Sequence, residues 1–557
     1  MTTLDFITII AFAMGIIAAG LSFSKSGKNM KSFFAAGGEV AWWISGLSLF
    51  MGFFSAGTFV VWGSIAYSDG LVAITIQMCM CIAGFVVGFL IAPKWKKTNV
   101  LTAAEYISTR FGVATQKTYT YIFLLISLFT SGSFLYPVAK IVEVSTGLPL
   151  YWAIALLGVI SILYVAIGGL WAVVVTDVLQ FVILTAAVII VVPLAFSRVG
   201  GVSGFIEGTP TGFFELFSDE YTPWFLIAFC IYNLFFLGGN WSYVQRYTSV
   251  STPQNARKVG LLFGGLYLIS PILWMLPPMI YRVFNGVGLE GLANEGAYLL
   301  MCKEALPSGL LGLMLGGMVF ATASSLNGSL NISAGVFTND IFKKLYPTAS
   351  NELLMKVARY STLGFGLLAI VVASLIPLMG GIVNVVISVA ALTGVPIYMP
   401  IIWTLFSKRQ TRFTILFTTL FSLGVNATFK FITPIICDFS LTRTQEMVIG
   451  VVIPFILLVM FELYQKSRGF VDPNVELCLA AANKKREEER AIIEAQGVQE
   501  ESNESKQSLR VIGLGILLTG IVITALGTIA DAQSRVIVIV VGAVLALGGL
   551  FIYKNKK

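Results

Sequence analysis

A run of hydroxyl and amide side chains interrupts one apolar segment of this 557-residue chain. The segment reads GGMVFATASSLNGSLNISAGVF and includes Thr322, Ser324, Ser325, Asn327 and Asn331. Small polar residues of this kind can serve close packing between two membrane helices. Adjacent serine hydroxyls near free backbone carbonyls are also the neutral, hard oxygen ligands that a desolvated alkali cation requires. The run therefore indicates a candidate cation site.

A second candidate is Asp177, in the segment GGLWAVVVTDVLQ. It is the one carboxylate that lies well inside a predicted membrane span. An unpaired carboxylate in that position costs at least about 2.5 kcal/mol. Its presence indicates that a cation or a proton is its partner.

Other chemistries lack the residues that they need. The chain has no histidine, and its six cysteines form no CxxC motif or Cys/His cluster, which leaves a zinc site and a histidine proton relay unsupported. It has no phosphate-binding loop and no nucleophile beside a histidine base. The sequence therefore predicts neither an enzyme nor an ATP-driven pump.

Two glycine-interrupted segments point to a binding site in mid-membrane. Gly52 and Gly57 lie in SLFMGFFSAGT, and Gly238 and Gly239 lie in NLFFLGGN. Glycine pairs also occur as simple packing notches in membrane helices. However, these two segments open successive blocks of five predicted spans, and broken helices at matching positions of two halves are typical of inverted-repeat transporters.

The elements that position these residues follow from composition. Apolar residues make up 57% of the chain, charged residues 11%, and the mean hydropathy is +0.87. A soluble enzyme is excluded, and an all-α polytopic membrane protein is predicted. About fifteen spans of adequate length are expected, near 4–23, 40–67, 71–92, 117–139, 149–168, 171–197, 223–243, 258–281, 308–338, 357–378, 382–406, 413–432, 446–465, 511–530 and 536–553.

Loop charges orient these spans. The first span has no basic residue before it and is followed by Lys25, Lys28 and Lys31, which predicts a retained helix with its N-terminus outside. With that orientation roughly four of five basic residues fall on the inner side. The net charge of +8 is thus explained by topology and does not indicate nucleic-acid binding. A multi-pass protein of the cell (inner) membrane, with a cytoplasmic C-terminus, is expected.

The chain resembles the sodium:solute symporter family over about residues 1–465. The resemblance rests on FFAAGGEVAWWISGLSLFMGFFSAG, LTAAEYISTRFG, GGLWAVVVTDVLQ, NLFFLGGNWSYVQRYTSVSTPQNARK and ASSLNGSLNISAGVFTNDIFKK, in the family's order and spacing. It implies a leading helix, two inverted five-helix repeats of the leucine-transporter type and about four trailing helices. The expected division is 1–39, 40–198, 223–406, 407–465, a cytosolic helix and linker at 466–510, and a helix pair at 511–557.

The resemblance also implies a sodium site. Its ligands would be the backbone carbonyls of Met51, Phe54 and Ala321 and the hydroxyls of Ser324 and Ser325. Asp177 would match a family aspartate near the inward path of the ion. A second sodium site of some members would need serines where this chain has Asn327 and Gly328, so the sequence leaves the number of coupled ions open.

Solute contacts carried over from the family map to Ser55, Thr58, Gln77, Phe236 and Asn240. These residues form a neutral set of hydroxyls, amides and one aromatic ring, which favours an uncharged sugar or polyol. The predicted function is sodium-coupled symport of a small neutral polar solute across the bilayer, with sodium as the only cofactor and no obligatory protein partner. The alternatives are a monocarboxylate or amino-acid symporter, a transporter-like solute sensor and a sodium channel.

Overall fold

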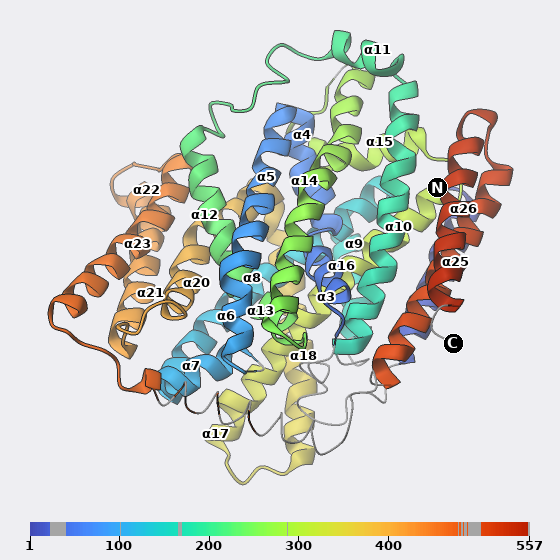
Figure 1. Ribbon diagram of the computed structural model, residues 1–557. Coiled ribbons are helices and arrows are strands. Elements are labelled where there is room, and N and C mark those ends of the chain that lie inside the picture. Colours follow the sequence, from blue (N-terminus) through green and yellow to red (C-terminus); the bar gives the residue numbers. More distant parts are fainter. Residues whose placement is uncertain are drawn as a thin grey trace.

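The computed structural model describes residues 1–22, 40–100, 102–164, 170–286, 288–476 and 503–554, with a few isolated residues between 477 and 502. Within these ranges the chain is a bundle of helices, most of which run side by side (Figure 1). Eleven helices are long and apolar enough to cross a membrane, one bent pair forms a twelfth span, and three shorter apolar helices accompany them. Each predicted span coincides with one of these helices, and the predicted fold class is confirmed.

The leading helix α1 (Thr3–Leu21) is followed by the first block of five spans. The first of these spans is broken, and residues 52–57 separate its two halves. The block consists of α3 (Trp42–Met51), η2 (Thr58–Trp62) and α4 (Gly63–Asp69), then α5 (Leu71–Val86), η3 (Val87–Ile91) and α6 (Ala92–Lys97), then α7 (Ala103–Phe111), α8 (Val113–Thr146), α9 (Leu150–Tyr164) and α10 (Leu170–Ser197).

A short helix, α11 (Gly201–Gly208), leads to the second block, which also opens on an interrupted span. The axes of α12 and α13 meet at an angle of 57°. The block consists of α12 (Pro223–Gly239), α13 (Trp241–Thr248), α14 (Pro253–Phe284), η4 (Gly291–Gly296), α15 (Ala297–Ala305), α16 (Leu310–Val336), η5 (Phe337–Phe342), α17 (Lys343–Leu345), α18 (Asn351–Leu375), η6 (Ile376–Met379), α19 (Ile382–Val389), η7 (Ala390–Gly394) and α20 (Val395–Thr404).

The remaining helices flank the two blocks on opposite sides (Figure 1). On one side are α21 (Arg412–Ala427), η8 (Thr428–Ile432), α22 (Thr433–Ile436) and α23 (Arg443–Ser467). On the other side α25 (Asn503–Ile529) and α26 (Ala532–Lys554) form a hairpin beside α10. The cytosolic helix and linker predicted at 466–510 lie largely outside the described residues.

Local sequence signals set the start of the second interrupted span and the start of the helix that follows it. Helices α12 and α14 both begin with a Thr-Pro pair. The Thr222 side chain accepts from the amide of Phe225 at 3.3 Å, and the Thr252 side chain accepts from the amide of Asn255 at 3.1 Å. A capping hydroxyl followed by proline at the first helical position stabilises a helix start without an unpaired donor.

Candidate functional site

The break in the first span leaves backbone groups outside regular helical pairing. Helix α3 ends at Met51, and the amide of Gly52 turns back to the carbonyl of Leu49 at 3.2 Å. Among the described residues, none donates a hydrogen bond to the carbonyl of Met51 or Phe54. Both residues are buried. A broken membrane helix thus presents two buried carbonyl oxygens as potential ligands.

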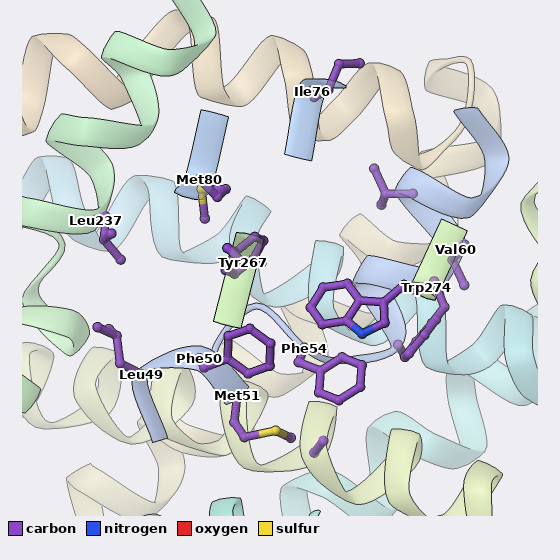
Figure 2. Close-up of a cluster of buried hydrophobic side chains, with 14 of the residues drawn as sticks. Leu49, Phe50, Met51, Phe54, Val60, Ile76, Met80, Leu237, Tyr267 and Trp274 are labelled. Carbon is purple, nitrogen blue, oxygen red and sulfur yellow. The ribbon is translucent and has the colours of Figure 1, made fainter. Parts of the chain in front are cut away.

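Aromatic packing fixes the shape of this break. The ring of Phe54 stacks on Trp274 of α14, with 4.4 Å between ring centroids and 3° between ring planes. The ring centroid of Phe50 lies 5.3 Å from that of Tyr267 on α14 and 5.7 Å from that of Phe181 on α10. Figure 2 shows Phe50, Phe54, Tyr267 and Trp274 gathered around the end of α3. Because large rings anchor the side chains, the backbone of the break is held in place.

The same break contacts the hydroxyl-rich helix α16. The amide of Ala56 donates to the hydroxyl of Thr322 at 3.0 Å. Thr322 follows Ala321 directly, and the Ser325 hydroxyl is 3.5 Å from the Ala321 carbonyl. The side chain of Ser324 lies outside the described residues. The structure therefore brings the broken helix into contact with α16 beside Ala321, one of the predicted cation ligands.

Asp177 on α10 has a cationic partner. Its carboxylate accepts a hydrogen bond from the hydroxyl of Ser48 on α3 and lies 3.9 Å from a guanidinium nitrogen of Arg246 on α13. The Arg246 Nε also donates to the Ser48 oxygen at 2.9 Å. These three side chains join one half of each broken span to α10. We call them the Asp177 cluster.

The pairing of Arg246 with Asp177 is not visible in the sequence. Arg246 follows the predicted span 223–243, in a connecting loop, but its side chain is only 13% exposed against Asp177. A loop arginine and an intramembrane aspartate 69 positions apart carry no sequence signal of pairing. Only the bend between α12 and α13 brings them together.

Phe236 and Asn240 lie at the second break. The Asn240 side chain accepts from the amide of Ser242 at 3.0 Å, so it caps α13, and its amide nitrogen donates to Tyr398 at 3.2 Å. The Phe236 ring lies 6.1 Å from Phe53 of the first break. The two interrupted spans therefore meet through aromatic side chains.

Two tyrosines that the sequence analysis missed complete this aromatic group. Phe236 lies 5.5 Å from Tyr243 on α13 and 5.8 Å from Tyr398 on α20. Tyr243 also lies 4.8 Å from Phe53. Nothing distinguishes these two among the chain's 19 tyrosines except their distance from the helix breaks.

The other predicted solute contacts are buried close to the first break or on α5. Ser55 is 5% exposed, and the hydroxyl of Thr58 donates to the carbonyl of Phe53. Gln77 is 2% exposed, and its Oε1 has no hydrogen-bond partner among the described residues. A buried amide oxygen without a protein partner is available for a solute hydroxyl.

Three further carboxylates, Asp5, Glu295 and Asp472, are at least as buried as Asp177. Asp5 on α1 accepts from the amides of Gly309 at 2.7 Å and Gly312 at 3.1 Å, where α16 begins. Glu295 in η4 accepts from the Tyr136 hydroxyl at 2.7 Å and the Ile382 amide at 3.0 Å. Asp5 lies at the start of the first predicted span, and Glu295 lies in the loop between the predicted spans 258–281 and 308–338, so the sequence gives no sign that either is buried.

Comparison with known proteins settles the family. The model of the sodium:solute symporter family matches residues 33–421. The chain belongs to the sodium:solute symporter family. Similar members include the sodium/glucose cotransporter of Vibrio parahaemolyticus, 29% identical over 68% of this chain and 76% of its own. The sodium/myo-inositol cotransporter 2 of Mus musculus is 28% identical over 73% of this chain and 67% of its own.

Solved structures agree on the fold. A Na⁺-coupled sialic acid symporter, solved in a substrate-bound outward-open state, matches with a TM-score of 0.70 and 21% identity over 84% of this chain and 98% of its own. The nucleobase-cation-symport transporter MHP1 matches with a TM-score of 0.50 and 12% identity over 82% of this chain and 99% of its own. Membership of the symporter family supports sodium as the coupling ion and transport, not enzymatic catalysis, as the activity.

Proposed function

We propose that this protein is a sodium-coupled secondary active symporter that imports a small neutral polar solute, with a sugar or polyol favoured. The observation that carries the proposal is the contact between the broken first span and α16, at Ala56 and Thr322. It joins two potential carbonyl ligands to a run of hydroxyls within a chain of the symporter family.

The proposed sodium ligands are the carbonyls of Met51, Phe54 and Ala321 and the hydroxyls of Ser324 and Ser325. Neutral oxygens can replace the hydration shell of an alkali ion without a buried counter-charge. Bound sodium would tie the break to α16 and so order the neighbouring solute contacts. The inward sodium gradient, with about 2.3 kcal/mol per charge per 100 mV of membrane potential, would drive uptake.

A neutral solute is supported by the residues around the two breaks. Ser55, Thr58, Gln77 and Asn240 offer hydroxyl and amide groups, and Phe236 offers an aromatic face. Asp177, which is hydrogen-bonded to Ser48 of the first broken span, is engaged by Arg246. A net charge on the solute would lack a counter-ion at the midplane, which is costly. The relatives named as cotransporters of glucose and of myo-inositol also support a neutral solute.

The sodium site is tested with Ser325→Ala in proteoliposomes under an imposed sodium gradient. Losing one cation ligand should raise the half-saturating sodium concentration at least several-fold. The matched control is Ser374→Ala on α18, whose hydroxyl also bonds the carbonyl four residues earlier, at 2.9 Å. Unchanged sodium dependence in Ser325→Ala would remove this residue from the site.

The solute class is tested by competition during sodium-dependent uptake of labelled sugars and polyols. Asn240→Ala should weaken solute affinity while sodium binding without solute stays nearly intact. An anionic solute neutralised by the sodium ion makes the opposite prediction, because simple monocarboxylates would then compete while sugars and polyols would not. Saturation of flux and its need for both ligands separate a symporter from a channel.

The orientation proposed for transport has the N-terminus outside and the C-terminus in the cytoplasm of the cell membrane. Single cysteines introduced at Thr2 and Lys557 would report the side of each terminus to an impermeant reagent. Labelling of both from one face would overturn this topology.

A further inference from the structure

A polar stripe runs along α21, a helix outside both five-helix blocks and remote from the proposed sodium site. Every fourth residue is polar over twenty positions, from just before the helix into η8. Five of the six members are at least nine-tenths buried. The members of the stripe are Gln410, Thr414, Thr418, Ser422, Asn426 and Lys430.

An aromatic ladder covers the neighbouring face of α21. Phe413, Phe417 and Phe421 are 66%, 39% and 47% exposed and stack on one another at 5.7 and 5.4 Å. Exposed phenylalanines on a membrane helix face lipid. The stripe therefore faces the protein, where α20, η7 and α23 pack against α21.

Four oxygen atoms of the stripe have no protein partner among the described residues. They are Oε1 of Gln410, Oγ1 of Thr418, Oγ of Ser422 and Oδ1 of Asn426. The adjacent Thr419 differs, since its hydroxyl bonds the Tyr119 hydroxyl at 2.7 Å. Buried polar atoms are normally paired with protein or with ordered water, above all within a membrane, where bulk water is absent.

Both ends of the stripe are held by carboxylates of one neighbouring helix. Lys430 Nζ contacts Glu446 at 2.7 Å and Ser388 at 2.9 Å. At the other end the Gln410 amide nitrogen donates to Glu462 at 2.9 Å. Both glutamates belong to α23.

A cavity opens at the Lys430 end of the stripe. Its lining includes Ser388, Asn426, Lys430 and Glu446. The Asn426 amide nitrogen is already used, because it donates to the carbonyls of Ala391 and Leu392 at 3.3 and 3.1 Å. Its unpaired Oδ1 is therefore the atom left to accept at the junction of cavity and stripe.

The distance between successive residues of the stripe matches the distance that one bridging water molecule can span. Four residues of α-helix rise by about 6 Å, and two successive O–H···O hydrogen bonds span about 5.5 Å. One water between successive side chains would bond both of them and give each unpaired oxygen a partner. We propose that α21 binds a file of ordered water molecules along this stripe, fed from the cavity at Lys430.

A metal cation fits this arrangement less well. A cation requires several oxygens that converge on one point, whereas these side chains are strung along the helix at regular intervals. The nearby carboxylates are already engaged by Lys430 and Gln410. The water file is independent of the proposed sodium and solute sites, which lie on other helices.

The test uses the full chain in lipid nanodiscs and X-ray radiolytic hydroxyl labelling, which marks side chains next to bound water. On α23, Met447 follows Glu446, the partner of Lys430, and the Leu458 carbonyl accepts from the Gln410 amide nitrogen at 3.4 Å. Their side chains are 1% and 0% exposed. Met447 should be labelled several-fold faster than the buried Met275 of α14. The pair Thr418→Val and Ser422→Ala should reduce labelling of Met447 and Leu458 at least threefold.

Thr419→Val is the matched control variant, because Thr419 is as buried as Thr418 but its hydroxyl has a protein partner. It should leave labelling at Met447 unchanged and lower the melting temperature. Thr418→Val should also lower the melting temperature, since a hydrogen bond to water is lost. Labelling of Met447 no faster than Met275, or a higher melting temperature in Thr418→Val, would overturn the proposal.

Discussion

The Asp177 cluster makes a quantitative prediction. At the observed 3.9 Å and an effective dielectric constant of about 20, the attraction between Asp177 and Arg246 is about 4 kcal/mol. Arg246→Met removes that attraction and leaves a carboxylate that is 6% exposed, with Ser48 as its one hydrogen-bond partner among the described residues. Breaking a buried ion pair from one side costs about 3–5 kcal/mol. We expect Arg246→Met to lower the free energy of unfolding by this amount.

The measurement is a double-mutant cycle with Arg246→Met, Asp177→Leu and the double variant. SDS titration of the purified protein in mixed micelles gives the free energy of unfolding of each. Either single variant leaves one buried charge unpaired, so each should be strongly destabilised. The double variant buries no charge and should recover most of the loss, which gives a coupling energy of about 2–4 kcal/mol.

An exposed ion pair supplies the matched control. Lys356 and Glu352 on α18 lie closer together, at 2.9 Å, but their side chains are 61% and 79% exposed. Water and salt screen such a pair, so Lys356→Met should lower the free energy of unfolding by about 0.5 kcal/mol or less. Equal costs for Lys356→Met and Arg246→Met, or additive effects in the Asp177 cycle, would refute the reasoning from burial.

Three further predictions concern the packing of individual helices. A Cβ at Gly520 would lie 2.3 Å from the Ala546 amide nitrogen, so Gly520→Val should force α25 and α26 apart and lower the melting temperature, whereas Gly548→Val, with open space around it, should not. Asp5→Asn should lower the free energy of unfolding in SDS by about 1–3 kcal/mol, because the side chain then has one accepting oxygen instead of two and cannot keep all of its donors. Full stability of this variant would contradict the assigned contacts. Glu295→Gln should speed hydrogen exchange at the amide where α19 begins, and an unchanged rate there would show that Glu295 does not hold that helix.

Much of the fold could be predicted from local composition. A span needs only a run of about 20 apolar residues, and such runs are visible without knowledge of their neighbours. The breaks were also predictable, because the glycines of SLFMGFFSAGT and NLFFLGGN weaken a helix wherever it packs. The candidate hydroxyl ligands Ser324 and Ser325 could also be predicted, because they are adjacent in the chain and lie within one family motif.

Tertiary structure alone decided which distant groups pair. Arg246 was expected in a loop, yet the bend after Asn240 carries it to Asp177 on α10. Asp5 begins a predicted span and Glu295 lies in a loop between two of them, and packing places them against the starts of α16 and α19. Sequence fixes hydrophobicity and helix breaks because these act over one or two turns. The partner of a buried charge depends on contacts between residues tens or hundreds of positions apart, which only the folded bundle determines.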